Sequence, residues 1–373
     1  MKIIYIANSF VPSKTANSIH VMKMCQSMAL LGHDIILLTF DSQKDEEQGV
    51  EDIYSYYGVK PIFKIKKIKL KTLKGKIHFF ALDAIKYAKS QSPDLVYTRC
   101  ELPAMYLSFT SLPFVVEAHK PFVDQGGLMR PMFKRLFLAR NLKRLVSISK
   151  ALESMFLKHF KPNAFESLVL HDAADQVETS QLSEIKLEGR QGVLQVGYFG
   201  HLYHGRGIEI IIEAAKQLPH VDFQIIGGRE QDVALWKAQA LDLGNVFLYG
   251  FVNPSEVQKY RQGCDVLLAP YQKEVWVANK GHESSKYMSP LKIFEYMSSS
   301  RCIICSDMPV LREVLNSFNA ILVAPDVVSE WVDAIKRCEN KAYREKFAKE
   351  AFKDFEEKYT WNKRAELALK DIV

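Results

Sequence analysis

The chain has 373 residues, of which 48% are hydrophobic and 25% charged, and its formal net charge is +7. This composition is that of a soluble globular protein, not a disordered or fibrous one, and the length allows two domains of ordinary size. No apolar run approaches the roughly 18 residues of a membrane span. The opening MKIIYIANSF predicts a buried strand and is too short for a signal peptide.

Six cysteines are spread along the chain, which favours a reducing cytoplasm over a disulfide scaffold. Cys302 and Cys305 have the spacing of a redox C-x-x-C motif. They lie in the apolar run RCIICSD, which predicts a buried strand where this motif would not start a helix. We therefore expect both side chains to be part of the core.

Positive charge is concentrated in two segments of the first half. Eight lysines and no acids lie between residues 60 and 76, and residues 130–145 interleave six arginines and lysines with large apolar side chains. A solvated strand edge and a surface helix would explain them, and so would a surface for anionic lipid or an acidic saccharide. No recognised nucleic-acid-binding module accompanies the charge, so no nucleic-acid partner is expected.

In the first half, short apolar runs alternate with amphipathic segments, which predicts a parallel sheet covered by helices on both faces. The expected strands are 2–7, 34–40, about 62–70, 94–99, 114–119 and 145–149. The expected helices include one ending before Gly32, one near 76–90, one between 99 and 114, and one near 130–143.

Residues 172–192 are polar and aperiodic, and the alternation restarts after them. We therefore expect an N-terminal domain over 1–175 and a C-terminal domain over 190–357. The expected elements of the second domain are strands in 192–200, 222–228, 246–252, 265–270, 301–307 and 320–325, with helices between them. Two doubly wound domains would face each other across a cleft lined by the carboxyl ends of their strands.

The stretch YFGHLYHGRGIEIIIEAA (198–215) leads from a strand through a glycine-spaced turn into a helix. Gly200, Gly205 and Gly207 allow close backbone approach to a ligand. The first helix amides lack intrahelical acceptors, and Arg206 supplies a fork of donors suited to phosphate. A plain strand-turn-helix connection with a solvated arginine is the alternative.

A second stretch, residues 287–315, has a Ser289-Pro290 turn followed by a helix with Lys292 in its first turn. Glu295 could cap that helix or bind ribose hydroxyls. Two anion sites in one domain favour a nucleoside diphosphate over a single phosphate.

These stretches resemble the retaining glycosyltransferases of family 4, which have the GT-B fold. The resemblance spans essentially the whole chain. Its strongest parts are GHLYHGRGIEIIIEAA and SPLKIFEYMSSSRCIICSDMPVLREVL, with support from IIYIANSFVP, LGHDIILLT, FVVEAH, VSISKALES, IIGG, VFLYGFV and YTWNKRA. Such a resemblance implies two Rossmann-like domains, with the nucleotide sugar bound mainly by the C-terminal domain and the acceptor by the N-terminal domain. It also implies that a last helix, here within 358–373, returns to the N-terminal domain.

The resemblance assigns roles to single residues. Arg206 matches a donor-diphosphate ligand, and Glu295 matches the second glutamate of the family's E-x7-E motif, usually a ribose ligand. The turn formed by Ser289, Pro290 and Leu291 matches backbone that approaches the phosphates and the sugar. His119 matches a histidine near the reaction centre. Donor binding by Gly200, His201 and Lys292 completes the expected site. The residues expected to take part in catalysis are His119, Arg206, Lys292 and Glu295.

The chain departs from the family pattern at three places. Tyr287 stands where the first glutamate of E-x7-E falls, His201 where an arginine is common, and Ala16-Asn17 where paired glycines are common. Arg206 and Lys292 are then the expected cationic pair. Tyr287 and His201 leave open how the donor sugar is handled.

We expect a hexosyl-type enzyme that moves a sugar from a nucleoside-diphosphate sugar to a saccharide or lipid-linked acceptor, at the cytoplasmic side of an anionic membrane. Fixed cations can stabilise the leaving diphosphate, and the sequence has no Asp-x-Asp motif in a convincing loop, so no metal is expected. A non-catalytic GT-B scaffold and a nucleotide-sugar epimerase remain alternatives. A dehydrogenase is disfavoured because the first turn lacks G-x-G-x-x-G.

Overall fold

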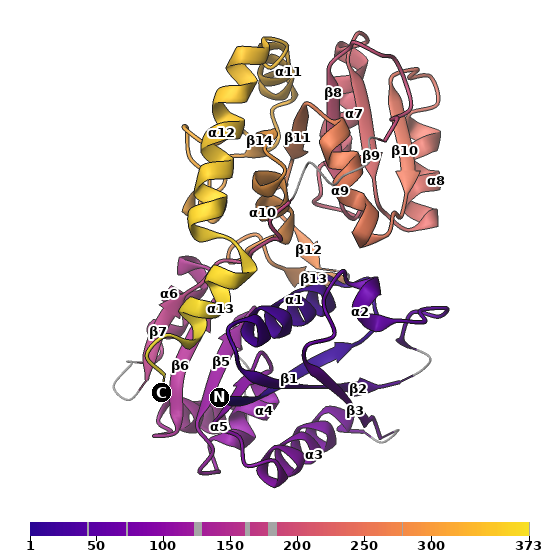
Figure 1. The fold of residues 1–373 in the computed structure, drawn as a ribbon. Coiled ribbons are helices and arrows are strands. Elements are labelled where there is room, and N and C mark those ends of the chain that lie inside the picture. Colours follow the sequence, from indigo (N-terminus) through magenta and orange to yellow (C-terminus); the bar gives the residue numbers. More distant parts are fainter. Residues whose placement is uncertain are drawn as a thin grey trace. The chain divides into compact units, whose positions relative to one another are not determined.

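The computed structural model describes residues 1–42, 45–71, 74–122, 129–160, 165–177, 185–277 and 279–372. The chain divides into two compact units. Unit 1 comprises Met1–Asp172 and Trp361–Val373, and unit 2 comprises Ala173–Thr360. Each unit has helices packed on a parallel sheet (Figure 1). The predicted pair of α/β Rossmann-like domains is confirmed.

The seven strands of unit 1 form one sheet in the order β3-β2-β1-β4-β5-β6-β7, with every pair parallel. They are β1 (Lys2–Phe10), β2 (Asp34–Asp41), β3 (Lys64–Lys69), β4 (Leu95–Thr98), β5 (Phe114–Ala118), β6 (Leu142–Ser147) and β7 (Glu166–Val169). The helices are α1 (Ala16–Leu30), α2 (Ile53–Tyr56), α3 (Lys76–Ser90), α4 (Glu101–Leu107), α5 (Met129–Phe137), α6 (Lys150–Leu157) and α13 (Trp361–Leu369). Since the strands are parallel, the residues after β1, β4, β5 and β7 lie along one edge of the sheet.

Local sequence explains where the main helices of unit 1 begin. The hydroxyl of Thr15 accepts a hydrogen bond from the amide of Ser18 at the start of α1, and Ser149 does the same for Leu152 at the start of α6. The central strands are buried on both faces, and all five residues of β5 are buried. One of those five is an acid, Glu117.

The helix expected near 130–143 is wrong at its end, because α5 ends at Phe137 and residues 142–147 form β6. Leu138, Leu142 and Leu145 continue an apolar spacing that a helix could use, which explains the error. Between α5 and β6, the side-chain amide of Asn141 donates to the carbonyl oxygens of Leu107, Thr110 and Leu112 and so ties this connection to the end of α4 and the segment after it.

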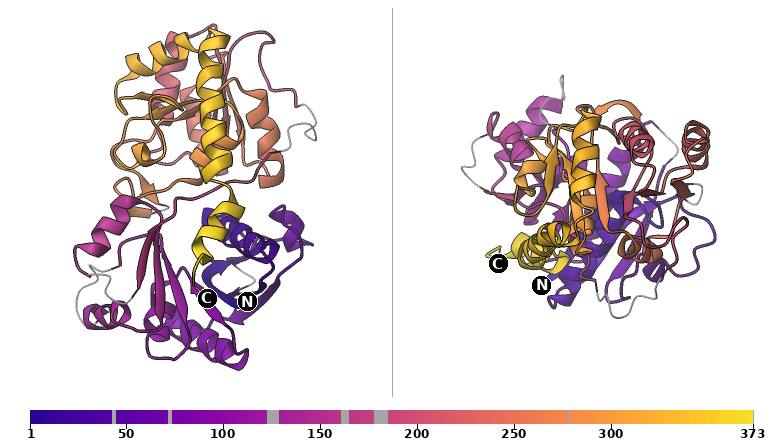
Figure 2. Two further views of the ribbon diagram at one scale, coloured as in Figure 1. Left: turned by 60° about the vertical axis from the view of Figure 1, so that its left-hand side comes forward. Right: turned by 90° about the horizontal axis from the view of Figure 1, so that it is seen from above.

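Arg144, expected on a surface helix, is instead buried in β6. Its guanidinium donates to the carbonyl oxygens of Leu367, Ala368 and Lys370 at the end of α13 and pairs with Glu166. Cations are favourable at helix C-termini. The C-terminal helix is therefore held on unit 1, where it packs on α1, and the views in Figure 2 show the yellow last helix beside the indigo first helix.

Unit 2 has a six-stranded parallel sheet in the order β10-β9-β8-β11-β14-β15 and a two-stranded antiparallel pair, β12-β13. The strands are β8 (Gln195–Phe199), β9 (Asp222–Ile226), β10 (Val246–Gly250), β11 (Val266–Ala269), β12 (Trp276–Val277), β13 (Asn279–Glu283), β14 (Cys302–Ser306) and β15 (Ile321–Val323). The helices are α7 (Ile208–Gln217), α8 (Glu230–Gln239), α9 (Pro254–Gly263), α10 (Leu291–Ser298), α11 (Val328–Arg337) and α12 (Lys341–Lys358), with a short 3-10 turn at Leu311–Glu313.

All six cysteines are buried and free. Cys302 and Cys305 lie in β14, so the expectation that this C-x-x-C contributes to the core is confirmed. Among the helices of the described residues, none combines the length and the apolar character needed to cross a bilayer.

Candidate functional site

The glycine-spaced turn in unit 2 connects the end of β8 to the start of α7. Gly207 is the residue before α7 and has a left-handed φ of 72°. A Cβ there would lie 1.9 Å from the carbonyl oxygen of Pro270, and one at Gly205 would lie 2.2 Å from that of Glu274. Glycine is therefore required at both positions. The start of α7 has no side-chain cap, which leaves its first amides for another acceptor.

Arg206 lies at the entrance to α7, between two tyrosines. Its guanidinium carbon is 5.1 Å from the ring centroid of Tyr203 and 5.5 Å from that of Tyr271. Its Nη2 is 3.5 Å from the Tyr203 hydroxyl, a long hydrogen bond, and its Nε is buried without a partner among the described residues. The rings hold the guanidinium by cation–π attraction and leave donors available for a ligand.

Lys292, in the first turn of α10, lies beside the same turn. Its Nζ is 3.7 Å from the ring centroid of Tyr198 and 5.3 Å from that of Tyr271. A Cβ at Gly200 would lie 3.2 Å from this Nζ. Tyr271 therefore contacts both cations, and the two stretches singled out in the sequence meet on its ring.

Neither Arg206 nor Lys292 forms an ion pair with a carboxylate of the described residues, although Glu295 is close enough to act on the charge of Lys292. Burial, followed by repulsion from Arg206, holds the pKa of Lys292 well below its usual range. An anion bound between them would relieve both penalties, since burying an unpaired charge is unfavourable.

His201 belongs to this cluster but carries no charge at neutral pH. Its ring stacks on Tyr203 with centroids 4.9 Å apart, and its carbonyl oxygen accepts a hydrogen bond from the Tyr198 hydroxyl. Desolvation within the turn, followed by repulsion from Arg206 and Lys292, lowers its pKa to about 4 although the residue is exposed. His201 therefore offers a neutral ring where an arginine is common.

The remaining expected ligands surround the start of α10. Ser289 is buried, Pro290 precedes the helix without a side-chain cap, and Leu291 is its first residue. The carboxylate of Glu295 accepts a hydrogen bond of 2.8 Å from Arg261 and is one-third exposed. Tyr287 lies in the turn before α10, where its backbone amide donates a hydrogen bond to the carbonyl oxygen of Ser284.

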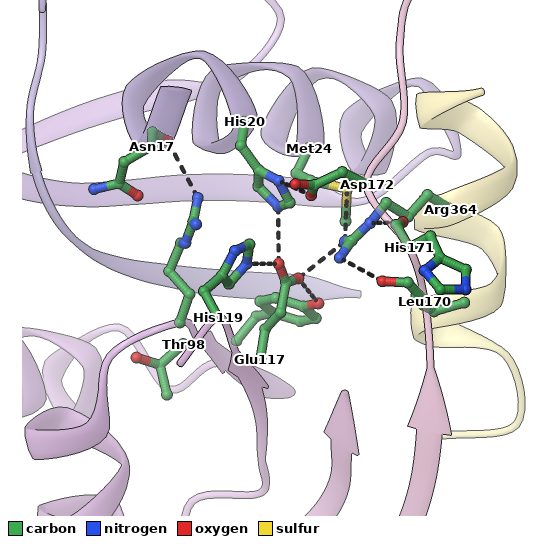
Figure 3. Close-up of polar contacts among 12 residues, drawn as sticks. Asn17, His20, Met24, Thr98, Glu117, His119, Leu170, His171, Asp172 and Arg364 are labelled. Carbon is green, nitrogen blue, oxygen red and sulfur yellow. Dashed lines mark hydrogen bonds and ion pairs between the residues drawn. The ribbon is translucent and has the colours of Figure 1, made fainter. Parts of the chain in front are cut away.

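His119 lies in unit 1, directly after β5, and belongs to a buried polar network (Figure 3). Its Nε2 is 2.5 Å from Oε1 of Glu117, and its side chain is 21% exposed. It is the member of the His20–Glu117–His119 group that reaches solvent. Burial, followed by the positive charge of Arg99, lowers the pKa of His119 to about 4.

His20, on the inner face of α1, bridges two carboxylates. Its Nδ1 is 2.8 Å from Oδ1 of Asp172, and its Nε2 is 2.8 Å from Oε1 of Glu117. The second contact is an ion pair and not a well-directed hydrogen bond, since Nε2 has no hydrogen-bond partner of good geometry. The ring of His20 therefore lies between the two buried carboxylates and contacts both.

Arg364, from α13, supplies a positive charge. Its Nη1 is 3.0 Å from Oε2 of Glu117, its Nε donates to the carbonyl oxygen of His171, and its Nη2 donates to that of Leu170. The Tyr97 hydroxyl also donates to Oε2. Burial alone would raise the pKa of Glu117, but Arg364 and His20 overcome this and hold it well below its usual range. The buried carboxylate of Glu117 is thus held by the Arg364 guanidinium, the Tyr97 hydroxyl and the two histidine rings.

The spacing of His20, Glu117 and His119 brings one potential metal-ligand atom from each residue to within 4.8 Å of the others. The donor set does not fit a metal, however. Both Nε2 atoms lie within 2.8 Å of the same oxygen, whereas ligands at tetrahedral zinc distances are about 3.3 Å apart. The Arg364 guanidinium on the other oxygen disfavours a further cation. The contact of His119 with Glu117 is a hydrogen bond, and that of His20 is a close polar contact.

Sequence reasoning missed most of both sites. In unit 2 it missed the platform of Tyr198, Tyr203 and Tyr271, although two of these lie in the quoted turn. In unit 1 it missed the network to which His119 belongs, whose other members are His20, Glu117, Asp172 and Arg364. One signal was available: an acid inside FVVEA, a strand otherwise apolar, demands a buried partner.

Comparisons with known proteins support the resemblance seen in the sequence. Residues 194–341 match the family described as Glycosyl transferases group 1. A stretch of 153 residues is 25% identical to the putative teichuronic acid biosynthesis glycosyltransferase TuaH of Bacillus subtilis (strain 168). It covers 41% of this chain and only 36% of that relative's length.

Solved structures match the whole chain. Sucrose-phosphate synthase from Thermosynechococcus elongatus has a TM-score of 0.73 at 16% identity, covering 98% of this chain and 97% of that one. Anabaena HepE, solved in complex with UDP, has a TM-score of 0.71 at 15% identity, covering 98% of each chain. The fold is therefore that of the GT-B glycosyltransferases.

Proposed function

We propose that this chain is a group 1 glycosyltransferase that moves a sugar from a nucleoside-diphosphate sugar to a saccharide or lipid-linked acceptor, with retention at the sugar carbon. The observation that carries the proposal is the pair Arg206 and Lys292, which share the Tyr271 ring and form no ion pair with a carboxylate of the described residues. The matched family and the bound UDP and UDP-glucose of the HepE structures support it.

The geometry accounts for stabilisation of the leaving group. As the bond between sugar and diphosphate breaks, negative charge develops on the phosphate oxygens. Arg206, Lys292 and the uncapped amides at the starts of α7 and α10 are fixed donors that need no reorganisation. Glu295 would accept hydrogen bonds from ribose hydroxyls while Arg261 holds its carboxylate in place.

The remaining steps of the proposal concern the sugar and the acceptor. His119 would contact the transferred sugar, and the acceptor would attack the face from which the diphosphate leaves. Because Arg206 and Lys292 can balance the diphosphate charge, we propose that no metal is required. A hexose is the proposed sugar, and the TuaH match makes a cell-envelope polysaccharide a reasonable acceptor.

The lysines of the edge strand β3 favour an acceptor held at an anionic membrane on the cytoplasmic side. Lys64, Lys66 and Lys69 are exposed, whereas Lys67 is paired with Glu46. Flotation with liposomes of neutral and anionic lipid tests this directly. Salt-sensitive binding to the anionic vesicles alone supports it, and equal binding to both or to neither contradicts it.

The donor proposal is tested by thermal shift with UDP-, GDP- and ADP-sugars, followed by turnover with saccharide and lipid-linked acceptors. We expect one nucleotide class to raise the melting temperature of the wild type but not of Arg206→Gln. Arg312→Gln is a matched control, because Arg312 is exposed and already forms an ion pair with Asp307. Stabilisation without turnover would favour the non-catalytic scaffold, and no stabilisation would refute the donor site.

A further inference from the structure

The network around His119 extends well beyond the residue itself. Its members come from four separate parts of unit 1: α1, β5, the segment after β7, and α13 (Figure 3). All but His119 are fully or almost fully buried. Burying such a network costs free energy unless every charge is compensated. The presence of this network next to a histidine that reaches solvent therefore requires an explanation.

We propose that Glu117 is a positioning residue that fixes His119 in the tautomer with its proton on Nε2, leaving Nδ1 as a hydrogen-bond acceptor for a hydroxyl of the bound sugar. This inference rests on the proposed function and adds the form in which His119 meets its substrate. A neutral sugar hydroxyl, not a carboxylate or a phosphate, is the group that such a nitrogen recognises.

The hydrogen bonds determine the tautomer. Oε1 of Glu117 can only accept, so His119 must donate from Nε2 across the 2.5 Å contact. A second proton on the ring is disfavoured because His20 lies edge-on, with centroids 4.9 Å apart, and Arg99 adds a further positive charge. Nδ1 has no hydrogen-bond partner among the described residues and is not enclosed by them. It is therefore an available acceptor.

Arg364 and Asp172 keep this arrangement in place. Arg364 occupies Oε2 of Glu117, so Oε1 is left for the two histidines. Asp172 contacts the other ring nitrogen of His20. The charged and titratable groups that face His119 or its partner carboxylate are Glu117 from β5, His20 from α1, Arg99 after β4, Tyr97 from β4, Asp172 after β7 and Arg364 from α13.

Glu117→Gln gives a specific expectation. Oε2 accepts from both Arg364 and Tyr97, so the amide oxygen must take that place and the amide nitrogen must face the histidines. His119 then accepts at Nε2, its proton moves to Nδ1, and the ring presents a donor to the sugar. Since mispositioning a reacting group can cost about 10²-fold, we expect kcat to fall on that order while KM for the nucleotide donor stays within about threefold.

The experiment is nitrogen NMR of the full chain labelled at histidine, with His119 assigned from its loss in His119→Gln. The expected wild-type spectrum has a neutral ring protonated at Nε2 from about pH 5.5 to 8, and Glu117→Gln moves the proton to Nδ1. Glu166→Gln is the matched control, because Glu166 pairs with Arg144 at the sheet edge and does not contact His119. It should keep the wild-type tautomer and kcat.

The outcomes separate this inference from the proposed function. A wild-type ring protonated at Nδ1, or charged near pH 7, overturns the inference even if the enzyme is active. An unchanged tautomer or an unchanged kcat in Glu117→Gln also overturns it. The absence of turnover with every donor refutes the proposed function while leaving the wild-type spectrum as expected. If Glu117→Gln does not fold, the wild-type spectrum still decides the tautomer.

Discussion

Replacement of Arg364 by methionine tests how the C-terminal helix supports the network in unit 1. The change removes the guanidinium that is 3.0 Å from Oε2 of Glu117 and that donates to the carbonyl oxygens of Leu170 and His171. Methionine fills similar volume without charge. Glu117, which has no exposed side-chain surface, loses its guanidinium partner and keeps only its contacts with Tyr97, His20 and His119.

The cost follows from the burial of the partner left behind. Breaking a buried ion pair on one side costs about 3–5 kcal/mol, and the remaining contact with His20 places this case near 3 kcal/mol. For a domain of about 150–250 residues, each kcal/mol lowers the melting temperature by about 2–4 °C, so we expect a drop on the order of 10 °C. Arg144→Met is the control. Arg144 also holds α13, but its acidic partner Glu166 is 56% exposed, so its loss should cost only about 1–2 kcal/mol.

Urea unfolding can be followed by fluorine NMR of 5-fluorotryptophan, because Trp361 is the tryptophan of unit 1 and the other three lie in unit 2. In the double variant Glu117→Gln/Arg364→Met the charge is removed from both partners, and the coupling should recover about 2 kcal/mol. The reasoning is refuted if Arg364→Met costs no more than Arg144→Met, or if the two changes at Glu117 and Arg364 are additive.

Three further predictions concern the donor turn and the response to pH. Arg206→Gln should weaken nucleoside-diphosphate binding by about 2 kcal/mol, roughly 30-fold by calorimetry, without lowering the melting temperature of the free protein, because no acid loses its partner. His201→Arg should tighten diphosphate binding and destabilise the free protein, because it adds a third cation beside Arg206 and Lys292; unchanged stability would count against crowding of like charges. As the pH is lowered from about 6.5 to 4, the free energy of unfolding should decrease. In this range the unfolded chain binds a proton that folded His119 takes up only near its pKa of about 4. The slope should be shallower in His119→Gln, as measured by urea unfolding across that range.

The donor turn could be predicted from the sequence because its parts are local. Gly205, Arg206 and Gly207 are neighbours, and the positive φ of both glycines is a local property of the turn, although the close approach of Pro270 and Glu274 is not. The identity of the cationic pair was also accessible from two short stretches. The contact of both cations with the ring of Tyr271 could not be predicted. Tyr271 follows β11 and is brought next to them only by the order of strands in the sheet.

The strand and helix alternation was predictable for the same local reason, and the error at 130–143 shows its limit. An apolar spacing of three to four residues cannot distinguish a continuing helix from a helix that stops before a buried strand. The connection after the helix is held by Asn141, whose three carbonyl partners are about 30 residues away in the chain. Arg144 was placed at the surface because arginine is usually exposed. Its actual burial depends on the carbonyls of a helix more than 200 residues later.

The network around His119 could not be assembled from the sequence, although part of it could have been suspected. Glu117 in a buried strand requires a cation, but the sequence offers many arginines and lysines and gives no reason to choose Arg364. The choice is made by topology: the parallel strands bring the residues after β5 and β7 to one edge, α1 covers that edge, and α13 returns to pack on α1. His20, His119 and Arg364, which lie up to 344 positions apart in the chain, thereby contact the carboxylate of Glu117, and His20 also contacts that of Asp172. The electrostatic state of His119 is consequently a property of the whole of unit 1, including its last helix, and no window of sequence around FVVEAH contains it.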